Sequence, residues 1–188
     1  MEHILTKCRS KARSTAWKLA DELWTGRGGT ELLTDIGNIM GCSLASFVTN
    51  DGLDDGKCRL YRIIVSETAY LIWKMRNERR IRDSDGNERD NIEGETETRW
   101  RNALTKRLTN DRYLTDSTRF GKRALNTSLV KRTWTGCLED EEVLPQDWHR
   151  LKGGFSGYIA GGSARICKVG PSPTQARSPT QSRAAASA

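Results

Sequence analysis

The segment 57–82, KCRLYRIIVSETAYLIWKMRNERRIR, constrains the fold of this chain more than any other part of it. Side chains that suit a protein core recur along it at near-helical spacing, on two adjacent rows: Leu60, Ile64, Leu71 and Met75, and then Tyr61, Val65, Thr68 and Ile72. A helix over this segment would present a wide apolar stripe, which must be buried. The segment therefore predicts a long helix with one face in a core.

Further segments carry helical patterns of apolar residues and predict an all-α protein. We expect helices from near Ser10 to before Gly26, over 32–47, over 95–113 and over 117–134. Gly37 and Gly41 weaken the second of these helices and Gly121 weakens the last, because glycine is a poor helix former. The loop between the second helix and the long helix is expected near residues 51–56. The expected architecture is a small irregular helical bundle.

The chain has six tryptophans, which is many for 188 residues. Trp17, Trp24, Trp73 and Trp100 lie on or beside the apolar stripes of the expected helices. Large aromatic side chains dominate the energetics of protein cores, so we expect these tryptophans to anchor the bundle. Stacking on nucleic-acid bases is the alternative role for each of them.

The length of the chain suits one domain with tails. Residues 10–150 carry the helical patterns and form the expected helical domain, and residues 1–9 precede it. From residue 151 a Gly-rich stretch leads to two tandem hexapeptides, SPTQAR and SPTQSR. Such repeats cannot bury a core, so we expect residues 151–188 to be a disordered C-terminal tail.

Basic residues outnumber acidic ones and give a net charge of +7 and a pI of about 9.3. This charge favours a polyanionic partner, although it also fits a surface that only keeps a protein soluble. If the helices over 57–82 and 95–113 pack antiparallel, their basic faces can lie on one side. The candidate nucleic-acid-binding residues are Arg76, Arg79, Arg80, Arg82, Arg99, Arg101, Lys106, Arg107, Lys122 and Arg123.

His3 and Cys8 form an H-x4-C pair near the N-terminus. This spacing suits the second half of a zinc knuckle, in which imidazole and thiolate bind a tetrahedral ion. A complete site needs two more ligands, normally a pair of cysteines upstream. The alternatives are an incidental pair in an unstructured segment, or completion in space by Cys42 or Cys58.

No set of residues with catalytic spacing is recognisable in the sequence, and no enzymatic activity is expected. His149 has no nucleophile placed near it by sequence, and the glycines at 26–29 and 153–162 lack the lysine of a phosphate-binding loop. No apolar run approaches the roughly 20 residues that cross a bilayer, and the polar N-terminus lacks a secretory signal. The five cysteines are scattered, without a C-x-x-C pair. We expect an intracellular protein, in nucleus or cytoplasm, without a membrane partner.

Several strings follow one another along residues 1–150: HILTKC, AWKLADELW, GNIMGCSLASF, RLYRIIVSETAYLIWKMRNERRI, RWRNALTKRLTNDRYLTD and KRTWTGCLEDEEVLPQDW. Together they resemble the C-terminal region of retroelement-derived proteins that are abundant in mushroom-forming fungi. In those proteins this region follows a reverse transcriptase and a ribonuclease H domain. The co-occurrence of SETAYLIWKMRNER with the closing TW...LP..W pattern makes the resemblance specific.

The resemblance implies that residues 1–9 are the remnant of a zinc-knuckle-like segment, in which His3 and Cys8 match the last two ligands. The other two cysteine ligands and the catalytic domains would lie upstream. Zinc would then bind only with those upstream ligands, and no cofactor is expected for the chain alone. We expect a non-catalytic accessory fragment of a retroelement polyprotein that binds RNA or DNA through its backbone, independently of sequence. The alternatives are a helical module whose apolar stripe docks on a ribonuclease H domain, and a decayed copy without function.

Overall fold

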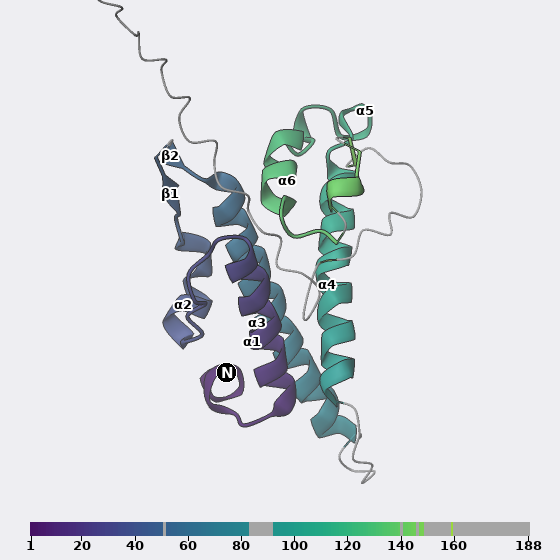
Figure 1. The fold of residues 1–188 in the computed structure, drawn as a ribbon. Coiled ribbons are helices and arrows are strands. Elements are labelled where there is room, and N and C mark those ends of the chain that lie inside the picture. Colours follow the sequence, from purple (N-terminus) through teal and green to yellow (C-terminus); the bar gives the residue numbers. More distant parts are fainter. Residues whose placement is uncertain (51, 83–91, 140, 146, 149–158, 160–188) are drawn as a thin grey trace, which may run out of the picture.

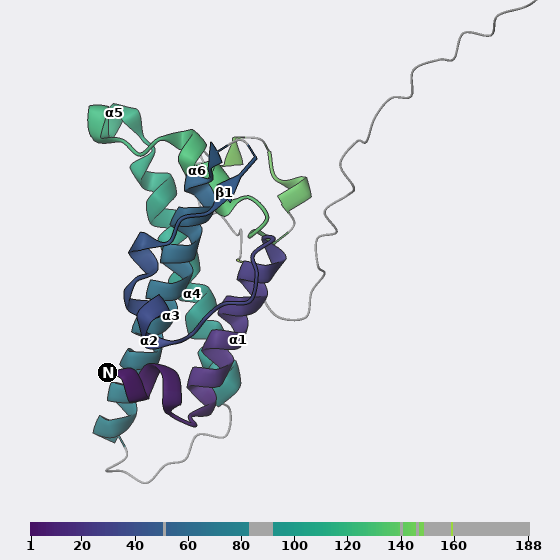
Figure 2. The same cartoon turned by 90° about the vertical axis from the view of Figure 1, so that its left-hand side faces the viewer.

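Three long helices packed side by side form the body of the protein in a computed structural model (Figure 1). The structure describes residues 1–50, 52–82, 92–139, 141–145, 147–148 and 159. The long helices are α1 (Lys11–Gly26), α3 (Asp55–Arg82) and α4 (Ile92–Leu114), and each contacts the other two. The turned view in Figure 2 shows the same three rods alongside one another. The all-α prediction is confirmed, whereas the expected tail lies, apart from Ile159, outside the described residues.

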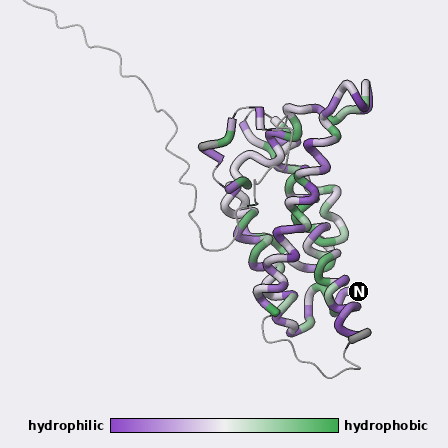
Figure 3. The backbone as a smooth tube through the Cα atoms, turned by 90° about the vertical axis from the view of Figure 1, so that its right-hand side faces the viewer, coloured by the Kyte–Doolittle hydropathy of each residue, from purple (hydrophilic) through white to green (hydrophobic). Residues whose placement is uncertain are grey.

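The apolar stripe of α3 is buried, as the sequence predicts. Leu60, Ile64, Leu71 and Met75 are all buried, because α1, α4 and α6 (Thr127–Trp134) pack around α3. Figure 3 shows hydrophobic and hydrophilic stretches alternating along the helices, as expected for rods with one buried face. The helix begins at Asp55, where the carboxylate of Asp54 accepts a hydrogen bond from the Lys57 backbone N–H at 2.9 Å.

Helices α3 and α4 run antiparallel. Their cross-contacts pair late residues of one helix with early residues of the other: Glu78 with Arg99, Thr68 with Trp100, and Arg59 with Asp111. The antiparallel packing, which the sequence analysis required if the basic faces of these two helices were to lie on one side, is therefore present.

The N-terminal residues fold back onto α1. His3–Lys7 form a π-helical turn, and the indole N–H of Trp17 donates a 2.9 Å hydrogen bond to the carbonyl of Leu5. Helix α1 itself ends at Gly26, one residue beyond the predicted end. The α1 prediction is thus confirmed, and Trp17 fixes the N-terminal turn to the bundle.

The predicted helix over 32–47 is wrong. A short α2 (Ile36–Met40) is followed by a 3₁₀ turn (Cys42–Leu44) and a two-stranded antiparallel hairpin, β1 (Val48–Thr49) and β2 (Gly52–Leu53). Asp35 sets the late start, because its carboxylate accepts the Asn38 backbone N–H at 3.0 Å and caps α2. Gly52 has a φ of +111°, which glycine adopts readily in such a turn.

The single helix predicted over 117–134 is also wrong. It is divided into α5 (Ser117–Phe120), a 3₁₀ turn (Gly121–Arg123) and α6. Gly121 has a φ of +54°, and Asn126 then starts a new helix by accepting the backbone N–H of Ser128 at 2.8 Å. Helix α6 crosses the start of α3 so closely that a Cβ on Gly56 would lie 2.8 Å from the backbone of Arg132.

Cys137 is fully buried after α6, and burial raises the pKa of its thiol from 9.0 to about 12. An unfolded chain would release this proton near pH 9, whereas the folded chain keeps it. The stability that the buried thiol contributes is therefore complete below about pH 9 and is lost as the pH rises toward 12. We expect the free energy of unfolding by urea to fall over this window less steeply for Cys137→Ala than for the wild type. An equal pH dependence of the free energy of unfolding for the two proteins would contradict a raised pKa of Cys137.

Candidate nucleic-acid interface

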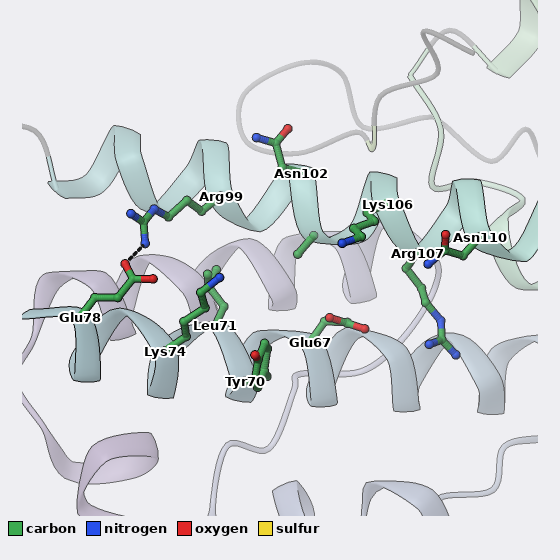
Figure 4. A pocket seen from close by; sticks show the side chains of 11 residues that line it. Glu67, Tyr70, Leu71, Lys74, Glu78, Arg99, Asn102, Lys106, Arg107 and Asn110 are labelled. Atoms are coloured by element: carbon green, nitrogen blue, oxygen red, sulfur yellow. Dashed lines mark hydrogen bonds and ion pairs between the residues drawn. The ribbon is translucent and has the colours of Figure 1, made fainter. Parts of the chain in front are cut away.

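A shallow hollow of about 490 Å³ lies between α3 and α4 (Figure 4). Helix α3 lines it with Glu67, Tyr70, Leu71, Lys74 and Glu78, and α4 lines it with Arg99, Asn102, Ala103, Lys106, Arg107 and Asn110. Both helices are anchored by their buried faces, so the backbone that carries these side chains is rigid. The antiparallel pairing therefore places cations from two distant parts of the sequence along one surface.

The cations of this hollow differ in how far their charge is compensated. Arg99 is paired with Glu78 at 2.5 Å and with Glu95 at 2.8 Å, and its hydrogen bond to Glu78 raises the pKa of the guanidinium. Lys74 and Lys106 are exposed and form no ion pair within the described part of the chain. Their charges remain available to an anionic partner, although Glu67 and Glu78 also line the hollow.

A second hollow of about 480 Å³ continues the first along α3. Arg107 lines both hollows, and the second is also lined by Arg62 and Ser66 of α3. Arg62, Ser66, Tyr70 and Lys74 follow one another at intervals of four residues, so they form one exposed stripe. We call the surface formed by Arg62, Lys74, Lys106 and Arg107 the cationic groove.

A bidentate ion pair joins Arg59, which lines the second hollow, to Asp111 of α4. The guanidinium of Arg59 donates to both carboxylate oxygens of Asp111, at 2.6 and 2.7 Å, and the indole N–H of Trp134 donates a third bond at 2.9 Å. Arg107 lies 3.8 Å from the same carboxylate, at the edge of the network. Asp111 is only 1% exposed, so this network ties α3, α4 and α6 together.

The structure brings Arg99, Lys106 and Arg107 of the predicted set to one surface. Arg76 and Arg79 are half-buried on another side of α3, against the N-terminal segment. Arg76 lies two residues after Lys74, and residues two positions apart in a helix point nearly opposite ways. The remaining members of the set also lie away from this groove or carry a partner. Arg101 is paired with Glu97 at 2.8 Å, Lys122 and Arg123 are exposed on the turn after α5, Arg80 is exposed near the end of α3, and the side chain of Arg82 lies outside the described residues.

Sequence reasoning left two cations of the groove, Arg62 and Lys74, out of the candidate set. Both lie in the basic segment that includes Arg76 and Arg79. A helical wheel with 3.6 residues per turn places Arg62 about 130° from the centre of the two buried rows, so its exposed position could have been predicted. Lys74 and Arg76 lie at similar angles on opposite sides of those rows, so the wheel alone does not separate these two residues.

The two metal candidates, His3 and Cys8, lie at the N-terminal turn. His3 is exposed and Cys8 is half-buried, and the backbone N–H of Cys8 donates to the His3 carbonyl at 2.7 Å. Among the residues that the structure describes, no group of three or more His, Cys, Asp or Glu side chains could hold a metal ion. The described residues therefore supply no ligands to complete a site around this pair.

A scan against protein-family models, a search of curated proteins and a search of solved structures each found no match. None of the described helices is both long and apolar enough to span a membrane. The function of the chain has therefore to be inferred from the groove itself.

Proposed function

We propose that this protein is a non-catalytic, nucleic-acid-binding module that holds the sugar-phosphate backbone in the cationic groove. The observation that carries the proposal is the convergence of Arg62, Lys74, Lys106 and Arg107 from antiparallel α3 and α4 on one elongated, exposed surface. Lysine and arginine contacts to phosphate supply most of the sequence-independent affinity for nucleic acid. The resemblance to the C-terminal region of retroelement proteins favours an accessory role beside a polymerase or ribonuclease H domain.

The geometry favours contacts to phosphates over readout of bases. The groove is a shallow surface between two helices, and its cations stand on rigid helical backbone. Neither α3 nor α4 projects as a separate recognition helix, since each packs against the other and against α1. Such a surface recognises the spacing of charges along a backbone, so its affinity should be insensitive to sequence and strongly dependent on salt.

A protein-docking role is the second candidate, and exposed apolar residues near the hairpin favour it. Leu44 is 84% exposed, and Val48 and Leu53, which pair across the hairpin, are also exposed. The apolar stripe of α3 does not serve this role, because it is buried within the protein itself. A partner such as a ribonuclease H domain would therefore have to contact the hairpin region rather than α3.

Reversing two charges of the groove tests the first proposal. We expect the double variant Lys74→Glu, Lys106→Glu to bind a fluorescein-labelled oligonucleotide at least 10-fold more weakly than the wild type at low salt, since attraction to phosphates is replaced by repulsion. The slope of log affinity against log salt is negative, and its magnitude should decrease by about 2, because each of the two lysines neutralises about one phosphate in the wild type. Fluorescence anisotropy over a series of salt concentrations measures both quantities.

Lys122→Glu, Arg123→Glu is the matched control, because it makes the same change of charge on the turn after α5. It should weaken binding only slightly. If both variants lose affinity equally, net charge rather than the groove drives binding. If the wild type binds no oligonucleotide at low salt, the nucleic-acid role is excluded and docking through the hairpin becomes the better explanation.

A further inference from the structure

Two large aromatic side chains, Tyr70 and Trp73, stand exposed on α3. Tyr70 is 58% exposed and Trp73 is 37% exposed, although the sequence predicts Trp73 in the core. Their rings are stacked on each other, with centroids 5.9 Å apart and planes inclined by 29°. The two rings cover part of each other, and both side chains keep surface that a further partner could contact.

One member of the aromatic pair, Tyr70, lines the cationic groove, and Trp73 is joined to the groove through its stacking on Tyr70. Tyr70 lines the hollow between α3 and α4, and Lys74 follows it one helical turn later on the same stripe (Figure 4). Lys106 and Arg107 line the same hollow from α4. A strand whose phosphates lie along these cations would therefore have its bases within reach of the aromatic rings.

We infer that Tyr70 and Trp73 form a base-stacking platform and that the groove takes single-stranded rather than duplex nucleic acid. The inference rests on the proposed function, since it assumes that the groove holds phosphates. Single strands expose the flat faces of their bases to aromatic side chains, whereas a duplex stacks those faces internally. The surrounding lysines argue against a protein partner for the pair, because lysine is depleted at protein–protein interfaces.

The other exposed tyrosine of the long helices, Tyr113, shows why exposure alone does not make a platform. Its ring face is covered by the guanidinium of Arg119, 5.0 Å from the ring centroid, and Phe120 packs edge-on at 5.3 Å. Tyr113 is therefore already engaged by its own neighbours. It supplies a control residue of the same type.

The test compares the affinity of the wild type with that of the double variant Tyr70→Ala, Trp73→Ala for three fluorescent probes of equal length, about 12 nucleotides. The probes are oligothymidylate, a mixed-sequence duplex and an abasic deoxyribose-phosphate strand. We expect the wild type to bind oligothymidylate more tightly than the other two. Loss of stacking should weaken oligothymidylate binding by about 5- to 100-fold in the variant. Binding of the abasic strand should be unchanged, because that strand has no bases to stack. Circular dichroism checks that the variant remains folded.

Two further variants complete the test. Trp73→Phe keeps a flat ring and should retain most of the affinity, and Tyr113→Ala should bind as the wild type does. Equal binding of single strand and duplex by the wild type, with no effect of Tyr70→Ala, Trp73→Ala, would overturn the platform and leave phosphate binding intact. Absence of binding to all three probes would overturn the proposed function together with the platform.

Discussion

Replacing Asp111 with alanine is expected to lower the free energy of unfolding by about 3–5 kcal/mol. The carboxylate is buried and receives two hydrogen bonds from Arg59 and one from Trp134. Its removal would leave a largely buried guanidinium and an indole N–H without their acceptor, on helices that Asp111 now joins. Urea unfolding followed by circular dichroism measures the change.

Glu97→Ala is the matched control for Asp111→Ala. Glu97 also pairs with an arginine of α4, Arg101 at 2.8 Å, but both side chains are partly exposed. A surface pair of this kind contributes about 0–1 kcal/mol. If Asp111→Ala costs no more than Glu97→Ala, the Arg59–Asp111 pair is not the link between α3, α4 and α6 that the structure indicates.

The long helices were predictable because each depends on a pattern within one continuous segment. The buried rows of α3 recur at helical spacing, and the glycines after α1 end it where expected. The predictions for the shorter elements failed because single side chains determine where these elements begin. Asp35 caps α2, and Asn126 starts α6 after Gly121, where the sequence predicted one continuous helix. Such caps compete with helical propensity over a few residues, which periodicity does not detect.

The site was only partly predictable, because the sign of a charge does not say which face of a helix carries it. Lys74 lines the groove, whereas Arg76, two residues later, packs toward the N-terminal segment. Asp111 gives no local signal at all, since it stands in a polar stretch and its partner Arg59 is 52 residues away. Only the packing of α3 on α4 distinguishes this buried carboxylate from the solvated ones around it.

Two tryptophans with the same kind of sequence environment also differ in how far they are buried. Trp73 and Trp100 both lie beside apolar stripes, yet Trp100 is 1% exposed and Trp73 is 37% exposed. The indole N–H of Trp100 donates a 2.8 Å hydrogen bond to the Thr68 hydroxyl, so α4 is tied to α3 by a polar contact inside the core. The two residues therefore have opposite roles, one in stability and the other in the proposed binding surface.

Trp100→Ala is expected to lower the free energy of unfolding by about 3–5 kcal/mol, because it leaves a cavity between packed helices. Trp73→Ala should cost less, about 1–2 kcal/mol, since Trp73 is 37% exposed and its removal leaves no enclosed cavity. Thr68→Val, which keeps the side-chain shape but removes the hydrogen-bond acceptor, should cost about 1–3 kcal/mol through the buried indole N–H left without a partner. Urea titrations of the three variants give the ranking, and a Trp73→Ala as damaging as Trp100→Ala would return Trp73 to the core and remove the aromatic platform from the surface of α3.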